Sequence, residues 1–265
     1  MIRLYFRLVG ATVRSQMQYK ASFIIEVLGF ALTTGLEWVT LAILFGRFPS
    51  LAGWSIAEVA LLYGLTSLAF SLAEMIARGF DAPFELMMER GTFDGVLIRP
   101  LGAFFQVLAS EFQLRRLGRS LQALGVLGYA FARLPIRWSP DKLLVVPLTL
   151  ASGTLIFIAL IVGSGTICFW TIRTPQIVHV FLSGGDFLMS HPFSIYNRWL
   201  RGIFTAIIPL AFVNYPAALW LLERSDPHGF PAWLAWYAPL VAAAFFGVAL
   251  LFWRFGVSKY TSSGS

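Results

Sequence analysis

Apolar runs approaching twenty residues recur along the whole of this chain, and they constrain its fold more than any other feature. A run of about twenty apolar residues is the length that an α-helix needs to cross the hydrocarbon core of a bilayer. Only 12% of the 265 residues are charged, whereas charged residues make up about 25% of a typical soluble domain. The sequence therefore predicts an all-α, polytopic membrane protein with a single domain, residues 1–265.

Six transmembrane helices are expected, at residues 21–45, 57–78, 117–134, 143–170, 202–222 and 237–256. The fifth contains two prolines, Pro209 and Pro216. Because proline lacks an amide hydrogen and disfavours helix at the residue before it, a break near residues 209–216 is expected. Non-helical backbone at that depth must be shielded from lipid by protein or water.

The first twenty residues contain too many arginines to span a bilayer. Apolar side chains recur there every three or four residues, and arginines occupy a neighbouring face: Ile2, Phe6, Val9, Val13 and Met17 beside Arg3, Arg7 and Arg14. This pattern predicts an amphipathic helix over residues 1–20 that lies in the membrane interface. A signal peptide is the weaker interpretation, because no compact apolar region with a small-residue cleavage site follows promptly.

The distribution of Lys and Arg predicts the orientation. With the N-terminus in the cytoplasm, fifteen of the 20 basic residues fall on the cytoplasmic side and five fall outside. Arg198 and Arg201, just before the fifth expected span, are counted among the fifteen. The positive-inside rule therefore places both termini in the cytoplasm. Topology also explains the net charge of +7, so no nucleic-acid partner is expected.

Recognisable catalytic and nucleotide-binding patterns are missing from the sequence. No G-x-x-x-x-G-K-[ST] loop occurs, so the chain is not expected to bind and hydrolyse nucleotide by that route. The hydrolase elbow G-x-S-x-G is missing as well. The single cysteine, Cys168, lies in an apolar run, and the histidines are scattered: His179, His191 and His228. We therefore expect no catalytic residues and no metal site.

A polar, turn-forming segment, residues 81–100, separates the second and third spans on the expected cytoplasmic side. Its first half predicts a short helix, because Pro83 suits a first turn and Gly91 suits a C-cap. Glu85 and Glu89 lie one turn apart. Four residues make this helix unusually apolar for a surface: Phe84, Leu86, Met87 and Met88. The helix either docks another protein or lies flat on the membrane interface.

Several glutamates fall inside expected spans. Glu26 and Glu37 are eleven residues apart, about three helical turns, and so share a helix face. An acidic side chain at mid-membrane costs about 3 kcal/mol on insertion scales, so it normally faces protein or a wet cavity. Glu37 is therefore a candidate for a substrate or cation pathway, with helix–helix hydrogen bonding as the alternative. Glu74 and Arg78, spaced i to i+4, are expected to pair.

Three segments carry a resemblance to one family. They are "ERGTFDGVLIRPLGAFFQVLASEF" before the third span, "HPFSIYNRWLRGIFTAIIPLAFVNYPAALWLL" across the fifth, and the tail "FWRFGVSKYTSSGS". The first is similar to a glycine–acid–leucine–arginine–proline signature, and the second has its prolines, tyrosines and asparagine in the order typical of that family. The whole chain resembles the membrane subunits of type-2 ATP-binding-cassette (ABC) exporters, in the branch that includes viologen-exporter-like permeases.

The resemblance implies an architecture and a partner. Such permeases have six spans, an interfacial N-terminal helix and cytoplasmic termini, and they lie in the bacterial cytoplasmic membrane. Two permeases, identical or related, pack together, and a separate ATPase subunit binds ATP and Mg. A cytoplasmic coupling helix between spans two and three docks into that ATPase. The segment after the fifth span often re-enters the outer leaflet, so residues 209–222 form either a re-entrant helix or part of one kinked span.

The resemblance also implies roles for particular residues. The coupling helix would be residues 81–90, and Gly91, Asp94, Arg99 and Pro100 would shape its exit. The candidate ATPase contacts are Pro83, Phe84, Glu85, Met87, Met88, Arg90, Gly91 and Asp94, and the candidate substrate-pathway residues are Glu37, Asn214 and Tyr215.

Two other functions compete with a permease subunit of an ABC exporter. An ATP-independent secondary transporter or channel would more often show inverted repeats with matching interrupted helices, and the sequence shows no convincing repeat. A membrane-embedded enzyme acting on lipid would need a catalytic constellation, and none is recognisable.

Overall fold

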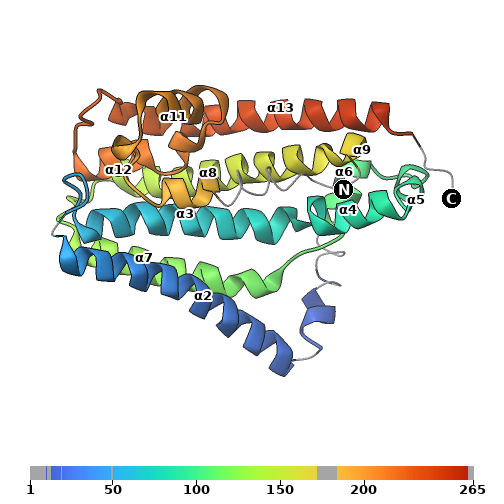
Figure 1. Ribbon diagram of the computed structural model, residues 1–265, viewed down its shortest axis with the longest axis horizontal. Coiled ribbons are helices and arrows are strands. Elements are labelled where there is room, and N and C mark those ends of the chain that lie inside the picture. The colour runs from blue at the N-terminus through green and yellow to red at the C-terminus, as the bar shows by residue number, and fades with distance from the viewer. Residues whose placement is uncertain (1–9, 11–12, 19, 49, 172–183, 262–265) are drawn as a thin grey trace.

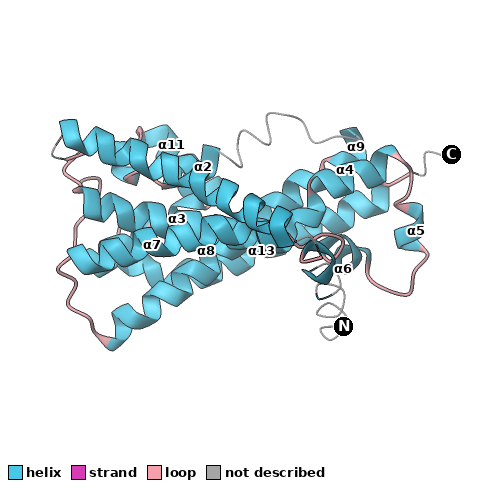
Figure 2. Ribbon diagram, turned by 90° about the horizontal axis from the view of Figure 1, so that it is seen from below, coloured by secondary structure: helices cyan, strands magenta, loops and turns pink. Residues whose placement is uncertain are grey.

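The computed structural model describes residues 10, 13–18, 20–48, 50–171 and 184–261. Within them the chain forms helices and turns and no named strand (Figures 1 and 2). The amphipathic helix expected over residues 1–20 lies mostly outside the described residues. In the part that is described, residues 13–16 are helical. There the side-chain Nε2 of Gln16 donates a 2.6 Å hydrogen bond to the Phe112 carbonyl. The side-chain Oε1 of Gln16 accepts a 3.1 Å hydrogen bond from the Leu114 backbone amide.

Among the described residues, four helices are long and apolar enough to cross a membrane, and they correspond to the first, second, fourth and sixth expected spans. They are α2 (Lys20–Arg47), α3 (Ile56–Ala77), α8 (Pro140–Thr166) and α13 (Ala238–Lys259). The third expected span is α7 (Leu117–Arg133), whose 17 residues give a length of only about 25 Å. All five run along the long axis of the molecule (Figure 1).

Helix α3 is the centre of the bundle. It begins with a capping box, in which the Ser55 side chain accepts from the Glu58 amide and the Glu58 carboxylate accepts from the Ser55 amide. Nearly all of its side chains are buried, between α7 on one side and α8 on the other. Helix α13 packs against α8, and α2 packs against α7. The α2–α7 contact is close because Gly118 has no Cβ to meet the backbone of Val27.

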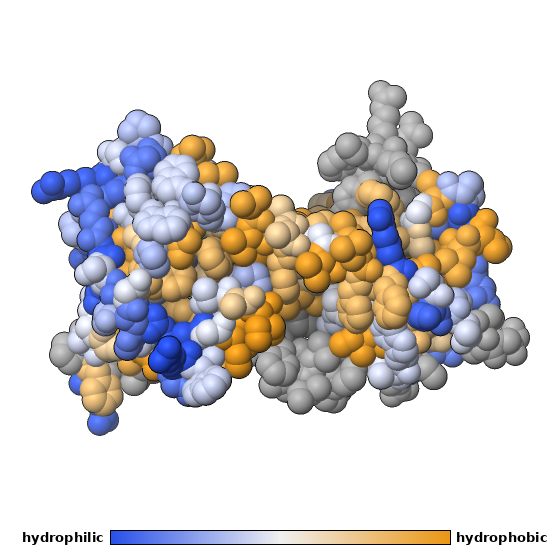
Figure 3. All heavy atoms as spheres, turned by 90° about the horizontal axis from the view of Figure 1, so that it is seen from above, coloured by the Kyte–Doolittle hydropathy of each residue, from blue (hydrophilic) through white to orange (hydrophobic). Residues whose placement is uncertain are grey.

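Short elements gather at the two ends of the bundle, which we name the α4 end and the α12 end (Figure 1). At the α4 end lie η1 (Arg78–Phe80), α4 (Ala82–Glu89), α5 (Asp94–Leu97), α6 (Ala103–Leu108), η2 (Leu114–Arg116) and α9 (Cys168–Thr171). At the α12 end lie η3 (Phe193–Ile195), α11 (Arg198–Gly202), η5 (Leu210–Val213), α12 (Tyr215–Leu222) and η6 (Ala232–Tyr237). Figure 3 shows hydrophilic residues at both ends of the molecule, with more of them at one end, and hydrophobic residues across the middle.

The fifth expected span, residues 202–222, is not a single helix. A five-residue π-helical turn, Ile203–Ile207, follows α11 and ends in a bend at Pro209, after which η5 and α12 follow. The break expected from the prolines is therefore confirmed. Proline removes one helical hydrogen bond and clashes with the preceding turn, which accounts for the interruption.

The position of Arg201 corrects its predicted side. Its guanidinium pairs with Asp226 at 3.1 Å, and the neighbouring Arg224 pairs with Glu58, at the start of α3, at 2.9 Å. The start of α3 is opposite the α4 end, so Arg201 lies at the α12 end together with the rest of α11. With Arg198 and Arg201 moved to the opposite side, thirteen of the 20 basic residues are predicted on the cytoplasmic side and seven outside. The cytoplasmic side still has the excess of Lys and Arg.

Candidate functional site

Helix α4 forms where the sequence predicts it. Pro83 occupies its first turn and Arg90 is its C-cap. Gly91 has a φ of +65°, a left-handed conformation that glycine adopts without steric cost and that commonly ends helices. The Thr92 amide then donates a 3.0 Å hydrogen bond back to the Met87 carbonyl. The expected short helix is therefore present, but its C-cap is Arg90, and Gly91 is the residue that follows.

The orientation of α4 corrects the expected contact set. Phe84 has no exposed surface and Met88 is 9% exposed, so these two side chains face the protein and are not presented to a partner. They are four residues apart and therefore lie on one helix face. Of the other expected contacts, Arg90 is exposed and five are partly exposed: Pro83, Glu85, Met87, Gly91 and Asp94.

The exposed face of α4 and α5 includes apolar residues that the sequence analysis did not choose. Leu86 is 43% exposed, Leu97 is 42% exposed and Ile98 is 85% exposed. Glu89 and Arg90 are exposed beside them. The spacing of Phe84 and Met88 could have revealed this face, because Leu86, two positions from each, must point in a different direction.

A group of aromatic side chains, which we call the α4-end aromatic cluster, holds α4 in place. It consists of Phe80, Phe84, Phe93, Phe104, Phe169, Trp253 and Tyr260. The Trp253 ring on α13 lies 5.0 Å from that of Phe80, 5.2 Å from that of Phe84 and 5.2 Å from that of Phe169 on α9. Most of these rings meet edge to face or tilted, which are favourable geometries. Helix α4 is therefore packed directly against α13 and α9, the short helix that follows α8.

Buried charges connect α3, α7 and the helical residues 184–189. The Arg119 guanidinium on α7 lies 2.5 Å from the Asp186 carboxylate and donates a 3.0 Å hydrogen bond to the Ser67 hydroxyl on α3. Arg119 also lies 4.9 Å above the Phe70 ring. Because an unpaired charge is costly in the hydrocarbon region, these contacts fix residues 184–189 against the middle of α3.

Glu74 has a different partner from the one expected. Its carboxylate lies 2.8 Å from the Arg116 guanidinium, at the start of α7. Arg78 instead forms an ion pair with Asp81, just before α4. The expected pairing of Glu74 with Arg78 is wrong, because α7 brings a second arginine to the same face of α3.

The three pathway candidates lie in different surroundings. Glu37 is exposed on α2 and accepts a 3.4 Å hydrogen bond from the Tyr63 hydroxyl. Asn214 is buried and donates to the Leu62 carbonyl, the Thr66 hydroxyl and the Met189 carbonyl. The Tyr215 hydroxyl is buried and donates to Asp226. Asn214 and Tyr215 therefore hold α12 in place, and their role as substrate contacts is not supported.

Comparison with known proteins identifies the class of the chain. Among the described residues, no group of three or more His, Cys, Asp or Glu side chains could hold a metal ion. No significant match is found among the curated proteins or among the solved structures. The family model for the ABC-2 family transporter protein, however, matches residues 31–264, which include part of α2 and all of α3, α7, α8 and α13. The chain therefore belongs to the ABC-2 family of transporters, whose membrane proteins are permeases and not themselves catalysts.

Proposed function

We propose that this chain is the membrane subunit of an ABC exporter of the viologen-exporter-like branch, and that α4 is its coupling helix. A separate ATPase subunit, which binds ATP and Mg, docks on the exposed face of α4 and α5. Membership of the ABC-2 family supports this proposal, as does the absence of a Walker A loop from the chain. The observation that carries it is the exposed apolar surface of Leu86, Leu97 and Ile98 beside Glu89 and Arg90.

Force from the ATPase reaches the membrane helices through the α4-end aromatic cluster. Phe84 projects from the buried face of α4 into contact with Trp253 on α13 and Phe169 on α9. Densely packed side chains resist deformation, so a displacement of α4 is passed to α13 and to the end of α8 instead of being absorbed locally. Phe84 thus acts as the connection between the docking surface and the bundle.

The proposed topology has six crossings with both termini in the cytoplasm. The α4 end is cytoplasmic and the α12 end faces outside, in keeping with the corrected Lys and Arg distribution. Helix α9 lies at the α4 end and α11 at the α12 end, so the chain has already changed ends before residue 202. Residues 209–222 are then the re-entrant part of the outer leaflet, of which α12 is the second half.

A second permease, identical or related, packs along α2. One face of that helix is an exposed apolar stripe made of Leu28, Leu32, Leu36, Val39 and Ile43. A stripe of this kind is suited to lipid or to another apolar helix. Glu37 is exposed on the same helix, so we place the substrate pathway beside it, at the interface between the two permeases.

Copurification tests the proposal. The tagged permease is extracted from its native membrane in a mild detergent, and the chains that accompany it are identified by mass spectrometry. We expect an ABC ATPase in the wild-type sample and its loss from Leu86→Glu and Ile98→Glu, because a buried unpaired carboxylate opposes docking. Arg137→Glu is the control, since Arg137 lies in the loop before α8 at the α12 end and should keep the ATPase.

Two outcomes would overturn the proposal. One is efflux of cargo by the purified permease in vesicles that contain no nucleotide and no second protein. The other is undiminished ATPase recovery when both Leu86 and Ile98 carry charged replacements.

A further inference from the structure

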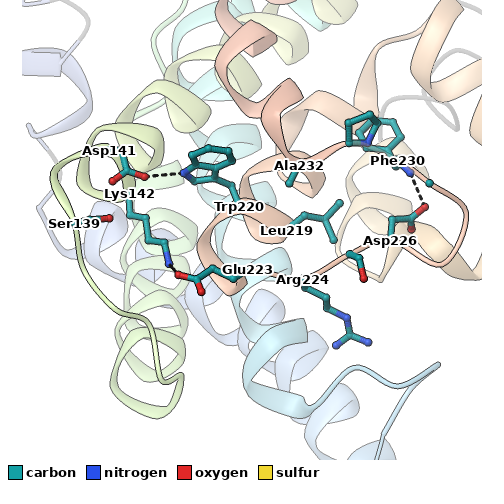
Figure 4. Close-up of a pocket in the computed structure, with 13 residues that line it drawn as sticks. Ser139, Asp141, Lys142, Leu219, Trp220, Glu223, Arg224, Asp226, Phe230 and Ala232 are labelled. Atoms are coloured by element: carbon teal, nitrogen blue, oxygen red, sulfur yellow. Dashed lines mark hydrogen bonds and ion pairs between the residues drawn. The ribbon is translucent and has the colours of Figure 1, made fainter.

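A cavity of about 620 Å³ opens at the α12 end, far from the docking surface (Figure 4). Its walls come from the first turn of α8, the last turn of α12 and the loop that leads into η6. Asp141 and Lys142 come from α8, and Trp220 and Glu223 come from the end of α12. Phe230 comes from the loop. The proposed function uses none of these residues.

The cavity wall is held in shape by buried Lys142. This side chain is 5% exposed, and its ammonium donates hydrogen bonds to the Leu221 carbonyl at 3.1 Å and to the Glu223 carboxylate at 2.6 Å. Leu221 is in the last turn of α12, where carbonyl groups lack helical partners. Lys142 therefore ties the start of α8 to the end of α12. Glu223 has a φ of +52°, an uncommon conformation for a residue with a side chain.

Most charges around the cavity already have a partner of opposite charge. Glu223 is paired with Lys142, Arg224 with Glu58, and Asp226 with Arg201. The N–O distance in each of these three ion pairs is 3.1 Å or less. These residues contribute little net charge to the cavity.

Asp141 differs from the other charged residues of the wall. Its carboxylate accepts a 3.0 Å hydrogen bond from the Trp220 indole, and no ion pair to it is found among the described residues. The indole is a neutral donor, so the hydrogen bond orients the carboxylate without cancelling its charge. The amino end of α8 favours the ionised form, because a helix N-terminus carries partial positive charge. The cavity therefore presents one negative charge that lacks a cationic partner.

The remaining wall is largely apolar. Leu219, Trp220, Phe230, Pro231 and Ala232 line the cavity. Aromatic faces attract cations as well as apolar groups. At the same end of the bundle, Trp233 and Tyr237 are 53% and 51% exposed, and such residues are enriched where a membrane meets water. A ligand can thus reach the cavity from the membrane surface.

We infer that this cavity binds an organic cation with an apolar body, with Asp141 as the counter-charge and Trp220 and Phe230 as the apolar wall. Two sources share that chemistry: a free amphipathic cation, and the ammonium headgroup of a membrane lipid such as phosphatidylethanolamine. The inference depends on side chains of this chain alone and does not require an ATPase.

Equilibrium dialysis of the purified permease in maltoside micelles tests the inference. The probes are tetraphenylphosphonium and its anionic counterpart of the same shape, tetraphenylborate, with binding to empty micelles subtracted. We expect the permease to bind the phosphonium in preference to the borate. Asp141→Asn keeps an acceptor for the Trp220 indole but removes the charge, so the affinity for the phosphonium should fall about tenfold. Glu26→Gln, at a separate cavity near the α4 end, is the matched control and should bind as wild type does.

A second titration, with added lipid, distinguishes the free cation from the lipid headgroup as the ligand. Phosphatidylethanolamine is added to the micelles before the phosphonium titration, with phosphatidylglycerol as the comparison lipid. Weaker phosphonium binding with the ethanolamine lipid alone identifies the headgroup as a ligand, and equal binding identifies the free cation. Should Asp141→Asn fail to fold, the salt dependence of wild-type binding serves instead, because screening weakens a charge-driven affinity.

Any one of three results would overturn the inference. The wild type binds phosphonium and borate equally, a folded Asp141→Asn variant keeps the wild-type affinity for phosphonium, or the wild-type affinity does not change with salt. Copurification of an ATPase would be unaffected by any of them, so the proposed function can stand while this inference fails.

Discussion

The two ends of the bundle are stabilised in different ways. At the α4 end, the short helices are held by aromatic packing around Trp253. At the α12 end, Asp226 is the central group and accepts hydrogen bonds from Tyr215, Arg201 and two backbone amides. Aromatic rings are present there too, including Tyr215 and Phe230 at 5.7 Å, but a charge lies among them.

Short helical elements gather at both ends, so the difference lies in what holds them. Between Arg198 and Tyr237 the chain passes through five short helical elements, and each leaves backbone groups without helical partners. Asp226, Lys142 and Asn214 satisfy such groups or anchor the elements to their neighbours. The α4 end instead packs on the ends of long helices, so apolar contact is sufficient. The α4 end therefore depends mainly on dense aromatic packing, and the α12 end depends on polar contacts as well.

The largest expected effect is at the α4 end. Phe84→Ala removes a fully buried ring from the aromatic cluster and should lower the free energy of unfolding by about 3–5 kcal/mol. Leu86→Ala, on the exposed face of the same helix, should change it by less than about 1 kcal/mol. Unfolding in mixed detergent and dodecyl sulfate micelles measures both. Similar losses for the two variants would contradict the assigned orientation of α4.

A smaller loss is expected at the α12 end. Asp226→Asn keeps one acceptor but removes the charge opposite Arg201 and leaves donors unsatisfied, so it should cost about 2 kcal/mol. The same micelle unfolding assay applies. Adding Arg201→Met to this variant should recover part of the loss, because the unpaired guanidinium is then removed. A double variant with the full additive loss of both single changes would show that the pair does not interact.

Two glycines on α8 provide a matched comparison of packing. A Cβ at Gly165 would lie closer than 3.0 Å to the Phe80 carbonyl oxygen, whereas a Cβ at Gly163 meets nothing within 4 Å. Gly165→Ala should therefore destabilise the protein by about 1–3 kcal/mol, and Gly163→Ala should stabilise it by about 0.5–1 kcal/mol. Thermal unfolding midpoints compare them directly. An unchanged or raised unfolding midpoint for Gly165→Ala would contradict the tight contact between α8 and η1.

The smallest expected effect is the pH response of the α12 end. Burial opposes ionisation of Asp226, but hydrogen bonds from Tyr215 and from the Phe230 and His228 amides, with the charge of Arg201, hold its pKa below the ordinary value of 3.8. A lowered folded pKa gives stability that is present above the ordinary value and lost as pH falls through the folded value. Between about pH 5 and pH 2 the wild type should therefore lose more stability than Asp226→Asn. Parallel acid curves for the two proteins would exclude this contribution.

Much of the fold could be predicted from local sequence properties. The lengths of apolar runs located α2, α3, α8 and α13, and the prolines located the break at Pro209. The short helix α4 was located as well, since Pro83 and Gly91 mark its two ends. Its contact face could not be predicted in the same way. Phe84 is as apolar as a residue that docks a partner, and only the positions of Trp253 and Phe169 show that it is buried.

What the sequence by itself determined is the membrane class, the long helices and the ends of α4. Hydrophobic length, proline and glycine act through the chain's own backbone and its immediate solvent, so a short window of residues is sufficient to read them. The tertiary structure alone decided that Glu74 pairs with Arg116, that Arg201 lies at the α12 end, and that Asn214 anchors α12. Each of these depends on which distant segment packs alongside, and spacing along one helix carries no information about that neighbour.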